Sequence, residues 1–486
     1  MAIKNRTIIF IAIVLLFIIA IATLPHDIID LTDVKDFSDT AKFFAGEYKA
    51  KLRTAHSLLY GFLLSPYVKL THSFILIKLA SAFWLFLLIL SVYYISNKNK
   101  KTLWLIVTCP LIWYMSPWLS PVPLVSLLFL WAYYFIKKFE TKDKIKYIVY
   151  AGLLIGIASA FWETAFYFSF IFLFSFLYNK KLYNSILFII AVFIGMIPNL
   201  ILNQLIFNFL FYSLAKHAFA AVSFALYGGA YNQGYSTGII NLFFIILFIP
   251  FYFYSLYKKE NFVKYKKELI FFPLLVLFIL TNPQIRLLLV IAPIIILILG
   301  EKLSQNQLKI QIIMFIILSM VAVSPYLIQS RFELSGTNGA ASFEEILGDI
   351  PKISLNPIFT NDIIKKDLDR ITKDYPNERF LAGPDNDHYT HLAHLYWGNK
   401  IKEFVSIEDY DLFLNNRTII ASKKIRSNAA PEFRREIWIE IGLGNNLNDN
   451  TDYNSIKYAI VLNDSLELDG FKLVKKYEIL NIFERA

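Results

Sequence analysis

The sequence TIIFIAIVLLFIIAIATL at residues 7–24 runs directly into PHDIIDLTDVKDFSD at residues 25–39. The first segment is uncharged and is about as long as an α-helix must be to cross the hydrocarbon core of a bilayer. The second carries five aspartates, Asp27, Asp30, Asp33, Asp36 and Asp39. Carboxylates at a membrane surface serve as a general base, a metal site or a cation-binding site.

The rest of the chain repeats the apolar pattern. Of its 486 residues 57% are hydrophobic and 17% aromatic, and short lysine-rich breaks separate the apolar runs. This pattern predicts an all-α polytopic membrane protein with about eleven transmembrane helices rather than a soluble core. The expected spans are 7–25, 73–96, 102–116, 120–136, 146–161, 163–178, 183–204, 239–257, 268–281, 285–300 and 308–328.

The charge is distributed unevenly. Residues 1–330 have a net charge of +16 and residues 331–486 a net charge of −5, within a total of +11. The basic excess lies in loops between spans, so it indicates topology and not nucleic-acid binding. The single cysteine, Cys109, excludes a disulfide within the chain and a cysteine-based metal site.

The lysine-rich breaks predict the topology. Lys4 and Arg6 precede the first span, which we expect to be a retained signal anchor although Ala20-Ile21-Ala22 resembles a cleavage site. Every even-numbered exit is basic, so these exits and the N-terminus are expected to be cytoplasmic. The odd-numbered exits are then extracytoplasmic. They are the acidic loop 26–58, residues 116–123, the turn at Glu163, residues 205–238, the turn 281–286 and everything after 328.

Three regions follow from these patterns. Residues 1–330 form the transmembrane domain, with interfacial loops 26–62 and 205–238 that contain amphipathic stretches at 39–62 and 205–227. Residues 331–342 are a linker, and residues 343–486 are an extracytoplasmic α/β domain. Helices are expected at Asp362–Tyr375 and His388–Trp397, and strands at Arg379–Ala382, Lys402–Ser406, Thr418–Ala421 and Tyr458–Leu462.

Three short motifs carry a resemblance to a known family. In the acidic loop an acid, an aromatic residue and a glycine follow in order from Asp36 to Gly46, before the Leu/Tyr-rich run 57–66. YAGLLIGIA at 150–158 is a small-residue span, and TNPQIRLLL at 281–289 precedes Ala292-Pro293. In these motifs the chain resembles the GT-C superfamily of integral-membrane glycosyltransferases, which includes protein O-mannosyltransferases and aminoarabinose transferases.

The sequence also departs from the family pattern. His56-Ser57 stands where the family has Pro-Pro before the Leu/Tyr run, and Glu163 lies where a lysine often follows the small-residue span.

The resemblance implies transfer of a sugar from a polyprenyl-phosphate-linked donor to a protein, lipid or glycan acceptor on the extracytoplasmic face. An ionised carboxylate would deprotonate the acceptor as it attacks C1, and cations would stabilise the leaving phosphate. We expect Asp36 to be the base, with Asp33 next and Asp39 third or as a substrate contact. Lys51, Arg53 and above all Arg286 are expected to contact the phosphate, because all three fall on the predicted outer side.

His56 and Glu163 complete the predicted substrate-binding residues. His56 would assist proton transfer or bind phosphate, or else it packs in an aromatic belt. Glu163 is an acid near the end of a membrane hairpin, where such residues are often functional, or it reaches interfacial water. No metal site is expected, because the spacing of His388, His391 and His394 differs from the i, i+4 pair of zinc helices. The resemblance implies no certain cofactor, and a divalent cation at the aspartates stays open.

Other interpretations remain. In a protein that transfers no sugar, the aspartates of the acidic loop would simply be solvated, and Arg286 would be an interfacial anchor. A transporter or lipid-linked sugar flippase would carry charges at mid-membrane depth and a repeat of interrupted spans. A polysaccharide polymerase or ligase would also use outer loops but would lack the early aspartate loop, and a non-catalytic membrane scaffold is a further alternative.

Overall fold

The structure is a computed structural model that is mostly helical, with a small sheet at the C-terminus. It describes residues 5–22, 31–46, 56–71, 79–116, 118–177, 182–218, 237–257, 259–281, 285–328, 360–376, 378, 380–382, 404–406, 457–462, 470–478 and 480–486. The first helices are α1 (Asn5–Ala22), α2 (Leu31–Ala45), α3 (Leu58–Thr71), α4 (Leu79–Ile95), α5 (Lys100–Thr108), α6 (Pro110–Met115), α7 (Val122–Lys142) and α8 (Lys146–Phe161). They are followed by α9 (Thr164–Leu177), α10 (Leu182–Phe207), α12 (Thr237–Tyr257), α13 (Lys259–Lys264), α14 (Lys266–Thr281), the 3₁₀ helix η3 (Ile285–Val290), α15 (Ala292–Lys302), α16 (Gln305–Ile328) and α18 (Thr360–Asp374).

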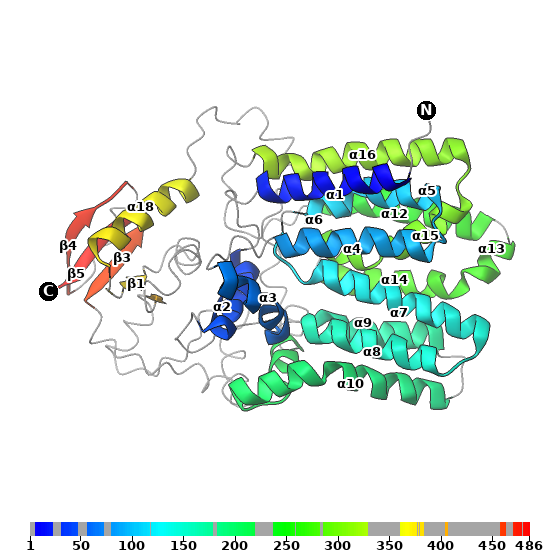
Figure 1. Ribbon diagram of the computed structural model, residues 1–486, viewed down its shortest axis with the longest axis horizontal. Coiled ribbons are helices and arrows are strands. Elements are labelled where there is room, and N and C mark those ends of the chain that lie inside the picture. The colour runs from blue at the N-terminus through cyan, green and yellow to red at the C-terminus, as the bar shows by residue number, and fades with distance from the viewer. Residues whose placement is uncertain are drawn as a thin grey trace.

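The long helices lie side by side as a bundle, and α2 and α3 lie at one end of it (Figure 1). The C-terminal sheet lies beyond that end in the same view. Each predicted span overlaps a helical segment, but two of them are interrupted. Span 102–116 is divided between α5 and α6 at Cys109, because Pro110 has no N–H to continue the helix. Span 285–300 begins as η3 and becomes α-helical only at Ala292, before Pro293.

Two of the described helices, α7 and α10, are long and apolar enough to cross a membrane. Several further apolar helices among the described residues, including α1, α4, α8 and α9, are shorter. Length and composition therefore support a membrane-like helical architecture in the part of the chain that the structure describes.

Glycines bring α8 and α10 into backbone contact. A Cβ on Gly156 of α8 would lie 2.9 Å from the Cα of Gly195 on α10, and a Cβ on Gly195 would lie 2.8 Å from the nitrogen of Ile157. One turn earlier, a Cβ on Gly152 would lie 2.6 Å from the carbonyl oxygen of Phe188. The small-residue pattern of the sequence thus creates a tight helix crossing of the kind that small residues also allow in membrane proteins.

The lysine-rich breaks that the structure describes lie at the end of the bundle opposite α2 (Figure 1). Asn5 Nδ2 donates to Tyr93 Oη at 2.8 Å. Lys101 Nζ donates to the carbonyl of Leu303 at 2.6 Å. Lys264 Nζ lies 2.5 Å from the Glu301 carboxylate. The N-terminus and the breaks after α4, α12 and α15 are therefore joined at this end.

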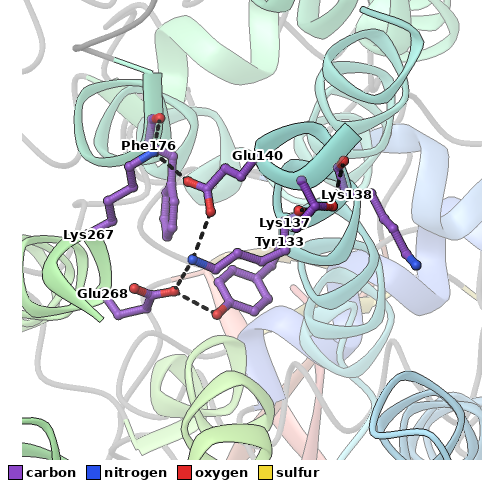
Figure 2. A network of polar contacts seen from close by, with 8 residues as sticks. Tyr133, Lys137, Lys138, Glu140, Phe176, Lys267 and Glu268 are labelled. Carbon is purple, nitrogen blue, oxygen red and sulfur yellow. Dashed lines mark hydrogen bonds and ion pairs between the residues drawn. The ribbon is translucent and has the colours of Figure 1, made fainter. Parts of the chain in front are cut away.

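A buried polar network ties α7, α9 and α14 at the same end (Figure 2). Glu268 of α14 is fully buried, and it accepts hydrogen bonds from Tyr133 Oη and Lys137 Nζ of α7, both at 2.7 Å. Lys137 Nζ also lies 3.0 Å from Glu140. Lys267 Nζ reaches Glu140 at 2.5 Å and the carbonyl of Phe176 at 3.2 Å. Two lysines and two glutamates thus compensate one another among three helices.

The C-terminal sheet has the strand order β2-β1-β3-β5-β4. β1 (Phe380–Ala382) is parallel to β2 (Phe404–Ser406) and β3 (Tyr458–Leu462), whereas β5 (Leu480–Arg485) is antiparallel to β3 and to β4 (Phe471–Lys476). Three expected strands and the helix at 362–375 are present. The β4–β5 hairpin was not predicted, and the elements expected at 388–397 and 418–421 lie outside the described residues.

α18 fixes the hairpin turn through Asp367. This carboxylate is buried and accepts the backbone N–H groups of Glu478 at 3.2 Å and Leu480 at 3.1 Å. Leu368 and Ile371 of the same helix are buried as well. The apolar face of α18 and its aspartate therefore act together to hold the sheet.

We expect acid to loosen this contact through Asp374. Its exposed carboxylate accepts from Lys475 Nζ and Tyr477 Oη, both at 2.5 Å, and these two bonds lower its pKa. A carboxyl with a lowered pKa stabilises the fold above its unfolded value, and that contribution is lost as the pH falls through the folded value. The protection factors of β4 amides, which correct exchange rates for the intrinsic effect of pH, should therefore be lower at pH 3 than at pH 7. In Asp374→Asn this difference should shrink, and an unchanged difference would contradict the assignment.

Candidate functional site

The predicted aspartates lie on α2. Asp33, Asp36 and Asp39 are three residues apart, so each position is turned back by about 60° from the one before and all three share one side of the helix. Asp33 and Asp36 come one turn before Phe37 and Thr40, which are buried. The side chains of the three aspartates lie outside the described part of the structure.

α3 crosses α2 closely because of a glycine. A Cβ on Gly61 would lie 2.5 Å from Thr40 Cβ and 3.0 Å from the backbone nitrogen of Ala41. Phe37 and Tyr60 pack edge to face across the same contact, with ring centroids 5.2 Å apart. The two helices of the acidic loop therefore form one packed unit.

His56 belongs to this unit. Its ring lies 5.1 Å from the ring of Phe37, the residue that follows Asp36. This ring contact is compatible with the aromatic packing role that was one of the expectations for His56. Because Phe37 directly follows Asp36, the imidazole of His56 also lies beside the helix that carries the aspartates. Its role in proton transfer stays a prediction.

A chain of buried amides and hydroxyls anchors the start of α3. The Ser57 hydroxyl lies within hydrogen-bond reach of the Ala160 carbonyl and of Asn199 Oδ1, the latter at 2.9 Å. Asn199 Nδ2 donates to Ser213 Oγ at 3.1 Å, and Asn203 Nδ2 donates to the same oxygen at 2.9 Å. All of these side chains are buried. The chain therefore connects the acidic loop, the end of α8, α10 and the segment after α10.

Glu163 lies in the turn between α8 and α9, next to this chain. Its side chain is 1% exposed, and it interacts electrostatically with Tyr167. The neighbouring Thr164 Oγ1 lies 3.2 Å from His217 Nε2, and the Tyr167 and His217 rings are 5.7 Å apart. Glu163 is thus built into the protein, which argues against a side chain that only reaches interfacial water.

Arg286 is the second residue of η3 and lies against Trp118 of the segment 116–123. Its guanidinium carbon is 5.7 Å from the centroid of the Trp118 ring, and Trp118 is itself 4% exposed. Ser126 Oγ of α7 donates to the carbonyl of Leu289 at 2.7 Å, which holds η3 against α7. An arginine stacked on a buried tryptophan is fixed by protein contacts. A lipid-facing snorkelling anchor would be less constrained.

Segment 116–123 also contacts the acidic loop. Tyr60 Oη of α3 donates to the Ser120 carbonyl at 3.0 Å, while the Ser120 N–H donates to Ser81 Oγ of α4 at 3.3 Å. Tyr60 packs on Phe37 of α2. A path of contacts therefore runs from α2 through Tyr60 and Ser120 to the segment on which Arg286 lies.

The structure thus gathers His56, Glu163, Arg286 and the helix of Asp33, Asp36 and Asp39 at one end of the bundle, joined through intermediate residues. Lys51 and Arg53 lie outside the described residues, and their roles stay predictions. Within the described residues there is no group of three or more His, Cys, Asp or Glu side chains arranged for a metal ion.

Sequence reasoning missed several residues of this region: Tyr60, Trp118, Asn199, Asn203, Ser213 and His217. A signal existed for two of them. Asn199 and Asn203 are amides four residues apart in an otherwise apolar span, and polar residues at that spacing face a protein interior rather than lipid. The other four are ordinary in their local sequence and gain a role only through partners distant in the chain.

Comparison of the sequence with known proteins gives no further identification, since no protein-family model and no curated protein matches the chain.

Proposed function

We propose that the chain is a GT-C-like membrane glycosyltransferase that transfers a sugar from a polyprenyl-phosphate-linked donor to an acceptor on the extracytoplasmic face. The observation that supports it best is the packing of the acidic helix α2, by way of Tyr60 and Ser120, toward segment 116–123, whose Trp118 contacts Arg286 of η3. A base and a phosphate-binding cation at one end of a bundle are the two groups that this transfer requires.

About eleven spans are part of this proposal. Besides α7 and α10, apolar side chains are exposed along other helices of the bundle, such as Phe10 of α1 at 65%, Phe174 of α9 at 58% and Ile313 of α16 at 57%. Large apolar side chains exposed around a whole bundle are rare in soluble proteins and normal where lipid replaces water. The interrupted pairs α5–α6 and η3–α15 would each serve as one span.

The orientation follows from charge. The lysine-rich breaks lie together at one end of the bundle, and the positive-inside rule assigns that end to the cytoplasm. The N-terminus is then cytoplasmic, and α2, α3 and the C-terminal α/β region are extracytoplasmic.

The chemistry uses a direct displacement. A carboxylate on α2, Asp36 or Asp33, takes the proton from the acceptor hydroxyl or amide as this group attacks C1 of the sugar. The bond between C1 and the phosphate oxygen breaks, and the polyprenyl phosphate leaves with the electron pair. Arg286 would stabilise the phosphate charge, since a guanidinium binds two phosphate oxygens at once. His56, beside α2, would receive or relay the proton.

The test is sugar transfer in vitro from polyprenyl-phosphate sugars by the purified full-length protein. We expect Asp36→Asn to lower the rate by about a hundredfold, because a general base contributes about that much. Asp33→Asn and Arg286→Ala should follow with smaller but clear losses.

Asp143→Asn is the matched control. It makes the same chemical change at the opposite end of the bundle, in a left-handed conformation (φ 47°) that asparagine tolerates well. Its rate should equal that of the wild type. Transfer that is unchanged in both α2 variants would refute the proposed base, and donor translocation without transfer would favour a flippase.

A further inference from the structure

α10 has an exposed apolar stripe along its whole length. Its members recur every three or four residues and are Leu182, Ile186, Ile190, Phe193, Ile197, Ile201 and Leu205. The last of them, Leu205, is 76% exposed. α10 runs along the lower edge of the bundle and reaches the end at which α2 and α3 lie (Figure 1), and it contacts α3. The stripe therefore leads along the bundle to the end at which the candidate site lies.

The stripe continues into a ledge of aromatic side chains, which consists of Phe43 and Phe44 of α2, Phe62 of α3, and Phe209 and Phe211 after α10. Phe43 and Phe44 are 5.4 Å apart, and Phe44 meets Phe62 at 5.1 Å, both edge to face. Phe43, Phe44 and Phe209 pack on the buried Phe207–Tyr212 pair, whose rings stack at 3.8 Å. Phe62 and Phe211 remain 49% and 39% exposed.

Cations lie at the inner side of this aromatic ledge. Lys216 Nζ is 5.7 Å from the centroid of the Tyr212 ring, and Lys42, which directly precedes Phe43 in the last turn of α2, is 6% exposed. A surface that is apolar along its length and basic at its end is complementary to a lipid with a long hydrocarbon chain and an anionic headgroup.

We propose that the α10 stripe and the aromatic ledge bind the hydrocarbon chain of the polyprenyl-phosphate donor. This inference rests on the proposed function and adds the path of the chain. The isoprenoid chain lies along α10 within the bilayer and crosses the ledge, which brings its phosphate to α2. The rigid aromatic side chains of the ledge lose little entropy when a flexible chain packs on them.

Binding is measured without relying on catalysis. The full-length protein in lipid nanodiscs is irradiated with a polyprenyl phosphate that carries a diazirine on the isoprene unit next to the phosphate, and the labelled peptides are identified by mass spectrometry. We expect labels on residues 205–211 and on Phe62. Excess unmodified polyprenyl phosphate should remove the labels, whereas excess phosphatidylglycerol should not.

Two surface variants extend the test to activity. Phe62→Ala and Leu205→Ala should raise KM for a long-chain donor about fivefold, while KM for a short, water-soluble isoprenyl donor stays unchanged. Phe10→Ala of α1 is the matched control, since Phe10 is an equally exposed apolar residue on another helix, and it should change neither KM.

Labelling along α1 or α16, or labels removed equally by phosphatidylglycerol, would overturn the inference. If the ledge is labelled but the protein transfers no sugar, the lipid-binding site stands and the proposed glycosyltransferase function is refuted. The two failures can therefore be distinguished.

Discussion

Glu268→Ala should lower the stability of the protein by about 2 kcal/mol, because the buried Tyr133 hydroxyl loses its acceptor and Lys137 loses one of its two carboxylate partners. Glu268 is fully buried and accepts from Tyr133 and Lys137. Its loss leaves the buried Tyr133 hydroxyl without this acceptor and Lys137 with Glu140 as its remaining carboxylate partner. Denaturant titration in mixed micelles measures the difference.

Glu301→Ala is the control for this prediction. Glu301 forms an ion pair of similar length with Lys264 at the same end of the bundle, but its side chain is 52% exposed. Exposed pairs contribute below about 1 kcal/mol, so this variant should be nearly as stable as the wild type. The double variant Glu268→Leu/Lys137→Leu should recover much of the loss, because an apolar pair replaces the ions. Equal losses of stability in Glu268→Ala and Glu301→Ala would show that burial of Glu268 does not make its contacts more important than those of an exposed ion pair.

Gly156→Leu should prevent α8 and α10 from packing. A Cβ alone at this position would lie 2.9 Å from the Cα of Gly195, so the helices must separate along their whole contact. We expect a loss of about 3 kcal/mol or more, since overpacking against backbone cannot be relieved by a change of rotamer. Yield and thermal unfolding of the purified protein provide the measurement.

The Gly156→Ala variant distinguishes a tight helix crossing from a loose one by whether it lowers or raises the stability of the protein. At a loosely packed helical site, alanine would stabilise the helix by about 1 kcal/mol relative to glycine. In the tight crossing it should destabilise instead. Because Glu163 follows α8 and Asn199 belongs to α10, a separation of these helices should also disturb the chain of hydrogen bonds at the candidate site. A stabilised Gly156→Ala variant would contradict the close contact.

The sequence predicted helix positions well because each long apolar run is a local signal that does not depend on distant segments. Even the interruption at Pro110 has a local cause. The partners of polar side chains depend instead on the packing of distant segments. Glu268 and Lys137 are far apart in the chain, and neither has a neighbouring residue that reveals the other.

In the candidate site, too, some features could be predicted from local sequence and others depend on the packing of distant segments. A carboxylate helix, Arg286 and Glu163 could be proposed from position in the topology, because each lies at a predicted outer exit. The contacts of Arg286 with Trp118 and of Thr164 with His217 depend on how the exits approach one another. The β4–β5 hairpin was missed for a different reason: the alternation of FKLVKK is weak, and its turn is fixed by Asp367 from α18.

The buried network also bears on how the chain is made. In the proposed topology Lys137 belongs to the positive segment that keeps the exit of α7 in the cytoplasm. During synthesis the ribosome adds Glu268 only after α8, α9, α10 and α12, so Lys137 lacks this partner while the orientation of α7 is being determined. When α14 arrives, Glu268 compensates that charge within the bundle. Lys137 would then first hold the exit of α7 in the cytoplasm and later pair with Glu268 when α14 inserts. The helices of the bundle would therefore assemble in a fixed order.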